Sequence, residues 1–213
     1  MTEEVTIIYT HWAMNPERSL MMRRSIESLI KTAENGRIMV YDNGGDEKDS
    51  SFLFDLCKRG KIHSYTRFYK NMHHVYTWND GARRARTKYL AMICNDILFT
   101  GNWLKDCVNF LENHEGKYLS TPIPADRANN RPKHYAGEID GWRLNSRAGS
   151  NVFVIRKEDF EKIGEFPPVT GSAWVNRYAQ MGYVVAIMPN PQAVDMAMKS
   201  GYDKGKPIEN LKL

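Results

Sequence analysis

YLAMICNDILFTGNWL, residues 89–104, joins a strand pattern to a polar pair that a buried strand does not need. Residues 88–94 are almost continuously apolar, which is typical of a strand buried on both faces of a parallel sheet. The strand ends on Asn95 and Asp96, and the next helix pattern begins near Asn102, too late for Asp96 to cap it. We therefore predict that Asp96 is a ligand at the carboxyl end of a central strand.

The chain around this stretch alternates between strand and helix patterns. We predict strands at 5–10, 37–42, 61–68, 88–94, 151–156 and 183–188, and helices at 16–34, 47–60, 73–87, 102–116, 157–164 and 172–182. Asn15 is expected to cap the first helix, with Pro16 at its first position. Such alternation predicts the α/β class, with a mostly parallel central sheet flanked by helices in a single domain, 1–213.

Composition limits the function less sharply than the strand pattern does. The 213 residues carry a formal net charge of +5, which permits a polyanionic partner without requiring one. No apolar run is long enough to span a membrane, and MTEEV does not resemble a signal peptide. The three scattered cysteines indicate a reducing compartment. We expect a cytoplasmic protein, or one in the host cytoplasm if a phage encodes it.

Polar residues follow three of the predicted strands. The first strand ends on Thr10, His11 and Trp12, the second on Asp42, and the fourth on Asn95 and Asp96. Because the carboxyl ends of parallel strands share one edge of a sheet, these residues are expected to form a site. Taken singly, Asp42 could also be an ordinary turn residue or helix cap, and Trp12 could be core.

Two further stretches need an interpretation. Residues 121–149 are polar and lack periodicity, so we expect a long functional loop there. The adjacent pair His73 and His74 is expected to be an ordinary surface feature, since neighbours on a helix do not readily chelate one ion. The sequence shows no dinucleotide-binding glycine motif, Walker loop, nucleophile elbow or zinc spacing.

The order of these motifs resembles the family 2 glycosyltransferases, which have the GT-A fold. The resemblance covers roughly residues 5–190. It rests on THWAMNPER (10–18), VYDNGG (40–45), Asn71 with WNDGARRA (78–85), YLAMICNDILFTGNWL (89–104) and GSNVFVIRKEDFEKIGEF (149–166). It implies a Rossmann-like GT-A domain with a nucleotide-sugar half, 5–116, and an acceptor half, 117–213, that contains the loop 121–149.

The resemblance also implies an activity and roles for single residues. We expect a metal-dependent, inverting hexosyl- or pentosyltransferase that uses Mn²⁺ or Mg²⁺ and a sugar nucleotide, with a UDP-sugar as the expected donor. A hard cation neutralises the departing diphosphate and prefers oxygen ligands. The family pattern implies metal ligation by Asp96 and Asp195, and donor contacts from Thr10, His11, Trp12, Asp42, Asn79 and Asn95.

The chain departs from the family pattern at two places. Cys94 stands at the first position of the D-x-D metal motif, so only Asp96 remains of its carboxylates. The positions that usually carry the catalytic base hold Thr170, Gly171 and Ala173, none of which accepts a proton. Among the acidic residues of the loop, Asp126, Glu138 and Asp140, we select Asp140 as the candidate base, because its Gly and aromatic neighbours suit an acceptor loop.

Several acceptors and activities stay open at this point. The acceptor is expected to be a saccharide. The alternative is a hydroxymethylated DNA base, as in phage DNA. In the loop 121–149, basic residues outnumber acidic ones and have aromatic neighbours, which suits a nucleic acid. The loop cations are Arg127, Arg131, Lys133, Arg143 and Arg147. The other classes are a non-catalytic nucleotide-sugar or glycan-binding protein and a nucleotidyltransferase, which usually needs a Gly-rich basic loop that THWAMN lacks.

Overall fold

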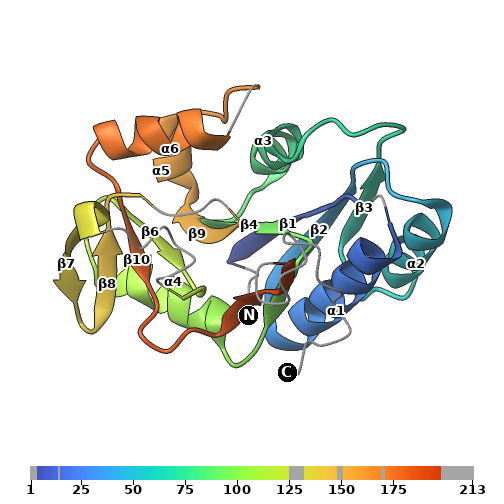
Figure 1. Ribbon diagram of the computed structural model, residues 1–213, viewed down its shortest axis with the longest axis horizontal. Helices are drawn as coiled ribbons and strands as arrows, with labels where there is room; N and C mark the ends of the chain where they lie inside the picture. The colour runs from blue at the N-terminus through green and yellow to red at the C-terminus, as the bar shows by residue number, and fades with distance from the viewer. Residues whose placement is uncertain (1–3, 14, 125–131, 148–150, 169–170, 198–213) are drawn as a thin grey trace.

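The computed structural model describes residues 4–13, 15–124, 132–147, 151–168 and 171–197. A large sheet with the strand order β3-β2-β1-β4-β9-β6-β10-β8-β7 forms the centre of the molecule (Figure 1). Its strands are β1 Val5–His11, β2 Gly36–Asp42, β3 Ser64–Arg67, β4 Tyr89–Cys94, β6 Tyr118–Thr121, β7 Tyr135–Ile139, β8 Trp142–Asn145, β9 Val152–Arg156 and β10 Val184–Ile187.

Helices cover both faces of this sheet (Figure 1). The helices are α1 Pro16–Thr32, α2 Glu47–Lys58, α3 His74–Arg84, α4 Trp103–Asn113, α5 Lys157–Ile163 and α6 Gly171–Gln180, with a short 3₁₀ turn at Pro132–His134. One apolar core joins the sheet to α1, α2 and α4, and a second joins its other face to α3, α5 and α6. The α/β class with a mostly parallel sheet is therefore confirmed.

Local sequence explains the elements that surround the polar edge. Asn15 caps α1 as predicted, because its side chain accepts a hydrogen bond from the backbone N–H of Arg18 at 3.0 Å, and Pro16 follows it. Every residue of β1 is buried, since this strand lies between β2 and β4 in parallel register. The edge that carries the predicted ligands is thus built on the most buried strand of the sheet.

Three elements differ from the sequence expectation. The region 121–149 is not one long loop, because residues 135–145 form the antiparallel hairpin β7–β8 at the end of the sheet. β6 was not predicted, and neither was the small sheet of β5 Ile97–Phe99 and β11 Ala193–Asp195. These strands have three to five residues, too few for a period to emerge from the sequence. Within the described part of the chain, no helix is long and apolar enough to cross a membrane.

Candidate active site

The carboxyl ends of β1, β2 and β4 meet at one edge of the sheet, as the sequence predicts. Parallel register sets His11 beside Asp42 and Thr10 beside Cys94, so the three turns adjoin. A cavity of about 400 Å³ opens there, which we call the rim pocket. Its walls are Thr10, Trp12, Asn15, Arg18, Asn43, Asn71, His73, His74, Cys94, Asn95 and Asp96.

Asp42 lies behind the rim pocket and does not line it. Its side chain is fully buried and accepts hydrogen bonds from the Gly45 backbone N–H at 2.8 Å, the Tyr65 hydroxyl at 2.7 Å and the Ser50 hydroxyl. Arg67 Nε lies 3.7 Å from Asp42 Oδ2. The carboxylate oxygens are therefore engaged within the protein, and this conformation does not offer them to a nucleotide.

The first strand divides its polar residues between the interior and the pocket. His11 is completely buried, and burial lowers its pKa although Asp42 and Asp49 oppose that shift. The buried Thr10 hydroxyl pairs with that of Thr77 at 2.6 Å, at the wall of the pocket. Trp12 is 42% exposed and is not core, so its indole borders the pocket.

Asn95 joins the turn after β4 to the end of β1. Its amide Nδ2 lies 3.2 Å from His11 Nδ1 and donates to the Trp12 carbonyl at 3.0 Å. Asn79, in contrast, lies outside the pocket walls, where its amide exchanges two 2.9 Å hydrogen bonds with the backbone of Phe166. Asn95 thus lies where a ligand would meet it, whereas Asn79 holds α3 against the segment after α5.

Asp96 is mostly buried and incompletely satisfied. Arg18 Nη1 donates to its Oδ2 at 2.9 Å, whereas its Oδ1 is buried without a hydrogen-bond partner. Burial and the neighbouring Asp195 carboxylate raise the pKa of Asp96 to about 6, against the opposing effect of Arg18. Burial and the like charge of Asp195 therefore outweigh the one guanidinium that this carboxylate contacts.

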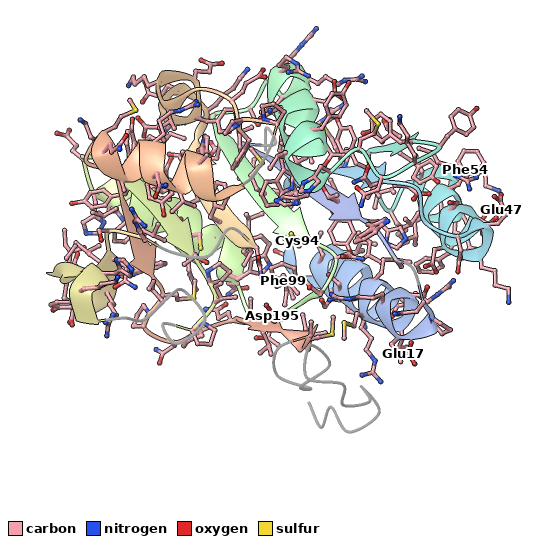
Figure 2. All side chains as sticks on the ribbon, turned by 45° about the horizontal axis from the view of Figure 1, so that its top comes forward. Glu17, Glu47, Phe54, Cys94, Phe99 and Asp195 are labelled. Atoms are coloured by element: carbon pink, nitrogen blue, oxygen red, sulfur yellow. The ribbon has the colours of Figure 1, made fainter. Side chains whose placement is uncertain are left out.

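Asp195 lies close to Asp96, behind the walls of the rim pocket rather than among them, and comes from the other end of the chain. β11 pairs with β5 so that Asp195 faces Ile97, and the Met196 N–H donates to the Asp96 carbonyl at 2.8 Å. Asp195 is buried and accepts a hydrogen bond from Asn151 Nδ2 at 3.0 Å. Figure 2 shows Cys94 near the middle of the molecule and Asp195 below it, contributed by separate elements.

The two carboxylates fit a divalent cation. Mg²⁺-like ions take one or two protein carboxylates and complete their shell with water and phosphate oxygens. The unpartnered Oδ1 and the raised pKa of Asp96 mark a carboxylate that a divalent cation would stabilise. Cys94 does not add a ligand, because burial raises the pKa of its thiol, and a soft protonated sulfur is a poor ligand for such ions. The described residues contain no group of three or more His, Cys, Asp or Glu that could hold an ion.

Asp140 lies at the same edge of the sheet as Asp96 but far along it. It occupies the turn of the β7–β8 hairpin, five strands from β4, or roughly 24 Å at about 4.8 Å per strand. Its exposed carboxylate lies 2.9 Å from His114 Nε2 and lines a separate groove. The structure does not bring Asp140 to the rim pocket, and its role as catalytic base stays a prediction. Asp126, and the base position Thr170, lie outside the described residues.

The rim pocket also contains residues that the sequence did not single out as ligands. Arg18 supplies a guanidinium, and Asn43 and Asn71 share a 2.7 Å hydrogen bond between their side chains. The exposed His73 and the half-buried His74 also line the pocket, and burial lowers the pKa of His74 to about 4. Asn43 could have been found, since it directly follows Asp42. Arg18 ends the THWAMNPER motif, but it lies in a helix, whereas the strand pattern points only to residues at strand ends as ligands.

Comparison with known proteins places this architecture in a known group. The sequence model described as "Glycosyl transferase family 2" matches residues 15–179. An uncharacterized glycosyltransferase of Rickettsia bellii (strain RML369-C) is 32% identical over 46% of this chain and 16% of the relative. The chain therefore spans only a small part of that curated relative.

Solved structures show the same fold at low sequence identity. The mannosyltransferase PcManGT of Pyrobaculum calidifontis, in complex with GDP-Man and Mn²⁺, superposes with a TM-score of 0.71 at 14% identity, over 96% of this chain and 60% of that one. GalNAc-T7 with UDP, GalNAc and Mn²⁺ gives 0.68 at 11% identity, over 90% of this chain and 43% of that one. The GT-A fold expected from the sequence is thereby confirmed.

Proposed function

The chain belongs to glycosyl transferase family 2, and from this premise we propose that it transfers a sugar from a nucleotide-sugar donor to an acceptor hydroxyl with Mn²⁺ or Mg²⁺. The observation that carries the proposal is the pair of neighbouring carboxylates, Asp96 and Asp195, with one buried oxygen of Asp96 unpartnered. When bound, the metal supplies charge neutralisation for the leaving diphosphate.

The chain's own residues would bind and orient the donor. Asp96 and Asp195 would hold the metal, and Trp12 and Asn95 would border the nucleotide in the rim pocket. Asn43 and Asn71 line the part of the pocket near the end of β2, where the side chains can donate to and accept from a nucleoside. Residues 5–116 would thus form the donor half, and residues 117–213 the acceptor half.

The chemical step breaks the bond between the sugar C1 and the diphosphate oxygen. The acceptor oxygen forms the new bond to C1, and its proton passes to a base. We propose a hexosyl or pentosyl transfer with inversion. The donor is proposed to be a UDP-sugar, and one similar structure contains UDP. Because another contains GDP-Man, GDP-sugars are the first alternative donors to test.

The decisive experiment follows donor hydrolysis, in which water replaces the acceptor. The protein is incubated with UDP- and GDP-sugars and MnCl₂, and release of the nucleoside diphosphate is measured. Slow release that EDTA abolishes and that Asp96→Asn removes is the expected result. If the protein binds sugar nucleotides but releases the nucleoside diphosphate from none of them, it is a binding protein. If it binds none of them, the proposal is refuted. Release of the nucleoside monophosphate and sugar 1-phosphate instead, from attack at the α-phosphorus, would indicate a nucleotidyltransferase.

A nucleic-acid acceptor is the second candidate. In the hairpin, the Arg143 guanidinium stacks on the half-exposed Tyr135 ring at 5.0 Å, an arrangement that can hold a base. Of the loop cations, Arg127 and Arg131 lie outside the described residues. A gel shift with hydroxymethylated DNA at low and high salt tests this acceptor, and absence of binding at low salt would exclude it.

A further inference from the structure

Arg18 is the cation that already occupies the carboxylate end of the rim pocket. It lies in the first turn of α1, and its Nη1 donates to Asp96 Oδ2 at 2.9 Å. The side chains of both partners are largely buried, with 26% of Arg18 and 14% of Asp96 exposed. Because this ion pair is shielded from water, salt screens it only weakly. Arg18 therefore competes with any other cation for Asp96 Oδ2.

A divalent cation and Arg18 do not fit the same carboxylate equally well. When all three are ionised, Asp96, Asp195 and Arg18 together carry a net charge of −1. A second monovalent cation would neutralise this charge, whereas a divalent cation would make the net charge positive. With the metal on Asp96, the guanidinium faces a like charge only a few ångströms away, and that repulsion weakens its hold on Oδ2.

The released guanidinium would still lie in the rim pocket. Arg18 lines the same cavity as Asn95 and Trp12, into which the donor is proposed to bind. Its planar fork of N–H donors matches the paired oxygens of a diphosphate as well as it matches a carboxylate. The cations of α3 are engaged elsewhere: Arg83 pairs with Glu165 at 2.7 Å and Arg84 with Asp80 at 2.8 Å.

We propose that Arg18 exchanges partners during donor binding. In the metal-free protein it holds Asp96, and once a divalent cation takes that carboxylate, Arg18 binds the diphosphate of the donor. Metal and nucleotide then bind with positive coupling that passes partly through this side chain. The inference rests on the proposed function, because it takes the metal and the sugar nucleotide from it.

The exchange predicts effects of opposite sign on the two ligands. In Arg18→Gln, Mn²⁺ alone is expected to bind about tenfold more tightly, because no guanidinium competes for Asp96. UDP or GDP in the presence of Mn²⁺ is expected to bind about tenfold more weakly, because the diphosphate loses its fork of donors. The coupling factor between metal and nucleotide therefore falls, and a residue that only stabilised the fold would not separate the ligands in this way.

Isothermal titration calorimetry measures the three equilibria: Mn²⁺ alone, nucleotide alone, and both together. Arg23→Gln is the matched control, since Arg23 lies on the same helix and pairs with the buried Asp49 at 3.1 Å outside the pocket. It should leave both affinities unchanged. Arg18→Lys keeps the charge without the fork and should give intermediate values. Thermal unfolding verifies that each variant is folded.

Pyrophosphate with Mn²⁺ separates the diphosphate from the nucleoside. Arg18→Gln should weaken pyrophosphate and UDP by similar factors. A loss confined to UDP would overturn the proposal, as would Mn²⁺ affinity that is unchanged or lower in Arg18→Gln. In those cases the wild type still binds donor with metal, and the proposed function stands. A wild type that binds no nucleotide with Mn²⁺ would overturn both.

Discussion

The turns after β2 and β4 look alike in sequence and behave differently in the fold. Each places an aspartate at the carboxyl end of a buried strand, Asp42 in one and Asp96 in the other. Asp42 is surrounded by donors from Gly45, Ser50 and Tyr65, which hold its carboxylate inside the protein. Asp96 has one partnered and one unpartnered oxygen and a second carboxylate beside it.

This difference shows how a fold separates a structural carboxylate from a ligand. A buried carboxylate whose oxygens all accept hydrogen bonds stabilises the native state, because its partners would otherwise be left unsatisfied. A buried carboxylate that lacks partners destabilises the native state until a cation binds. Asp42 therefore belongs to the scaffold, and Asp96 to the binding chemistry.

Removing the Asp42 carboxylate tests the scaffold role. Asp42→Ala is expected to lower the free energy of unfolding by about 3–5 kcal/mol, because buried donors on Ser50 and Tyr65 lose their acceptor. Urea unfolding followed by circular dichroism measures the change. Glu47→Ala is the control, since its exposed pair with Arg67 should contribute less than about 1 kcal/mol. If Asp42→Ala is as stable as wild type but loses nucleotide affinity, the sequence interpretation of Asp42 is restored.

The matching change at Asp96 is expected to act in the opposite direction. Asp96→Asn should raise the free energy of unfolding at pH 7 without metal by about 1–3 kcal/mol, because the buried charge disappears. The same variant should weaken Mn²⁺ binding by more than about 100-fold. Calorimetry and urea unfolding supply the two values, with Asp106→Asn as a control outside the rim pocket. A destabilised variant with wild-type Mn²⁺ affinity would reverse the assignment.

The pH dependence of stability is the next distinction. The pKa of Asp96 rises from 3.8 to about 6 on folding, so between pH 4 and 6 the folded state holds a proton that the unfolded state releases. Stability therefore falls as the pH rises through this window, by about 3 kcal/mol from this group. The difference between wild type and Asp96→Asn, measured in EDTA from pH 4 to 7, should show this fall. A flat difference would mean that Asp96 has an ordinary pKa.

The segment between β3 and α3 holds a strained residue. His73 has φ 73° and ψ 142°, a conformation that suits glycine, and the Asn71 side chain accepts from its N–H at 2.8 Å. His73→Gly is expected to raise the free energy of unfolding by about 1–3 kcal/mol, whereas His73→Ala keeps the strained Cβ and should not. Asn35→Gly is the comparison, since Asn tolerates its φ of 65° and should gain less. Equal values for His73→Gly and His73→Ala would show that the position is relaxed.

The smallest effect is expected at Asp140. Asp140→Asn should change the rate of donor hydrolysis less than about threefold, because the residue is roughly five strand spacings from Asp96. Sugar transfer and hydrolysis are compared with those of Glu138→Gln on the same hairpin. A loss of more than about 100-fold in Asp140→Asn alone would confirm the base that the sequence predicts.

Much of the fold was predictable because its signals are local. The apolar run of β4, the Asn15–Pro16 start of α1 and the polar strand ends follow from periodicity and capping over a few neighbouring residues. The edge at which Asn95 and Asp96 gather follows from the parallel order of the strands. The pair β5–β11 was not predictable, because its two strands come from distant parts of the chain. The hairpin β7–β8 is local, and it was missed because its strands of five and four residues are too short for a period to emerge.

The sequence by itself determined the α/β class, the family and the polar edge of the sheet. Only the tertiary structure decided which of its polar residues are scaffold and which are ligands. Asp42 and Asp96 both follow a buried strand in the sequence, and only the contacts from Ser50, Tyr65 and Arg18 separate them. The physical reason is that a carboxylate's role depends on the donors and charges around it, and those come from elements that only folding brings together.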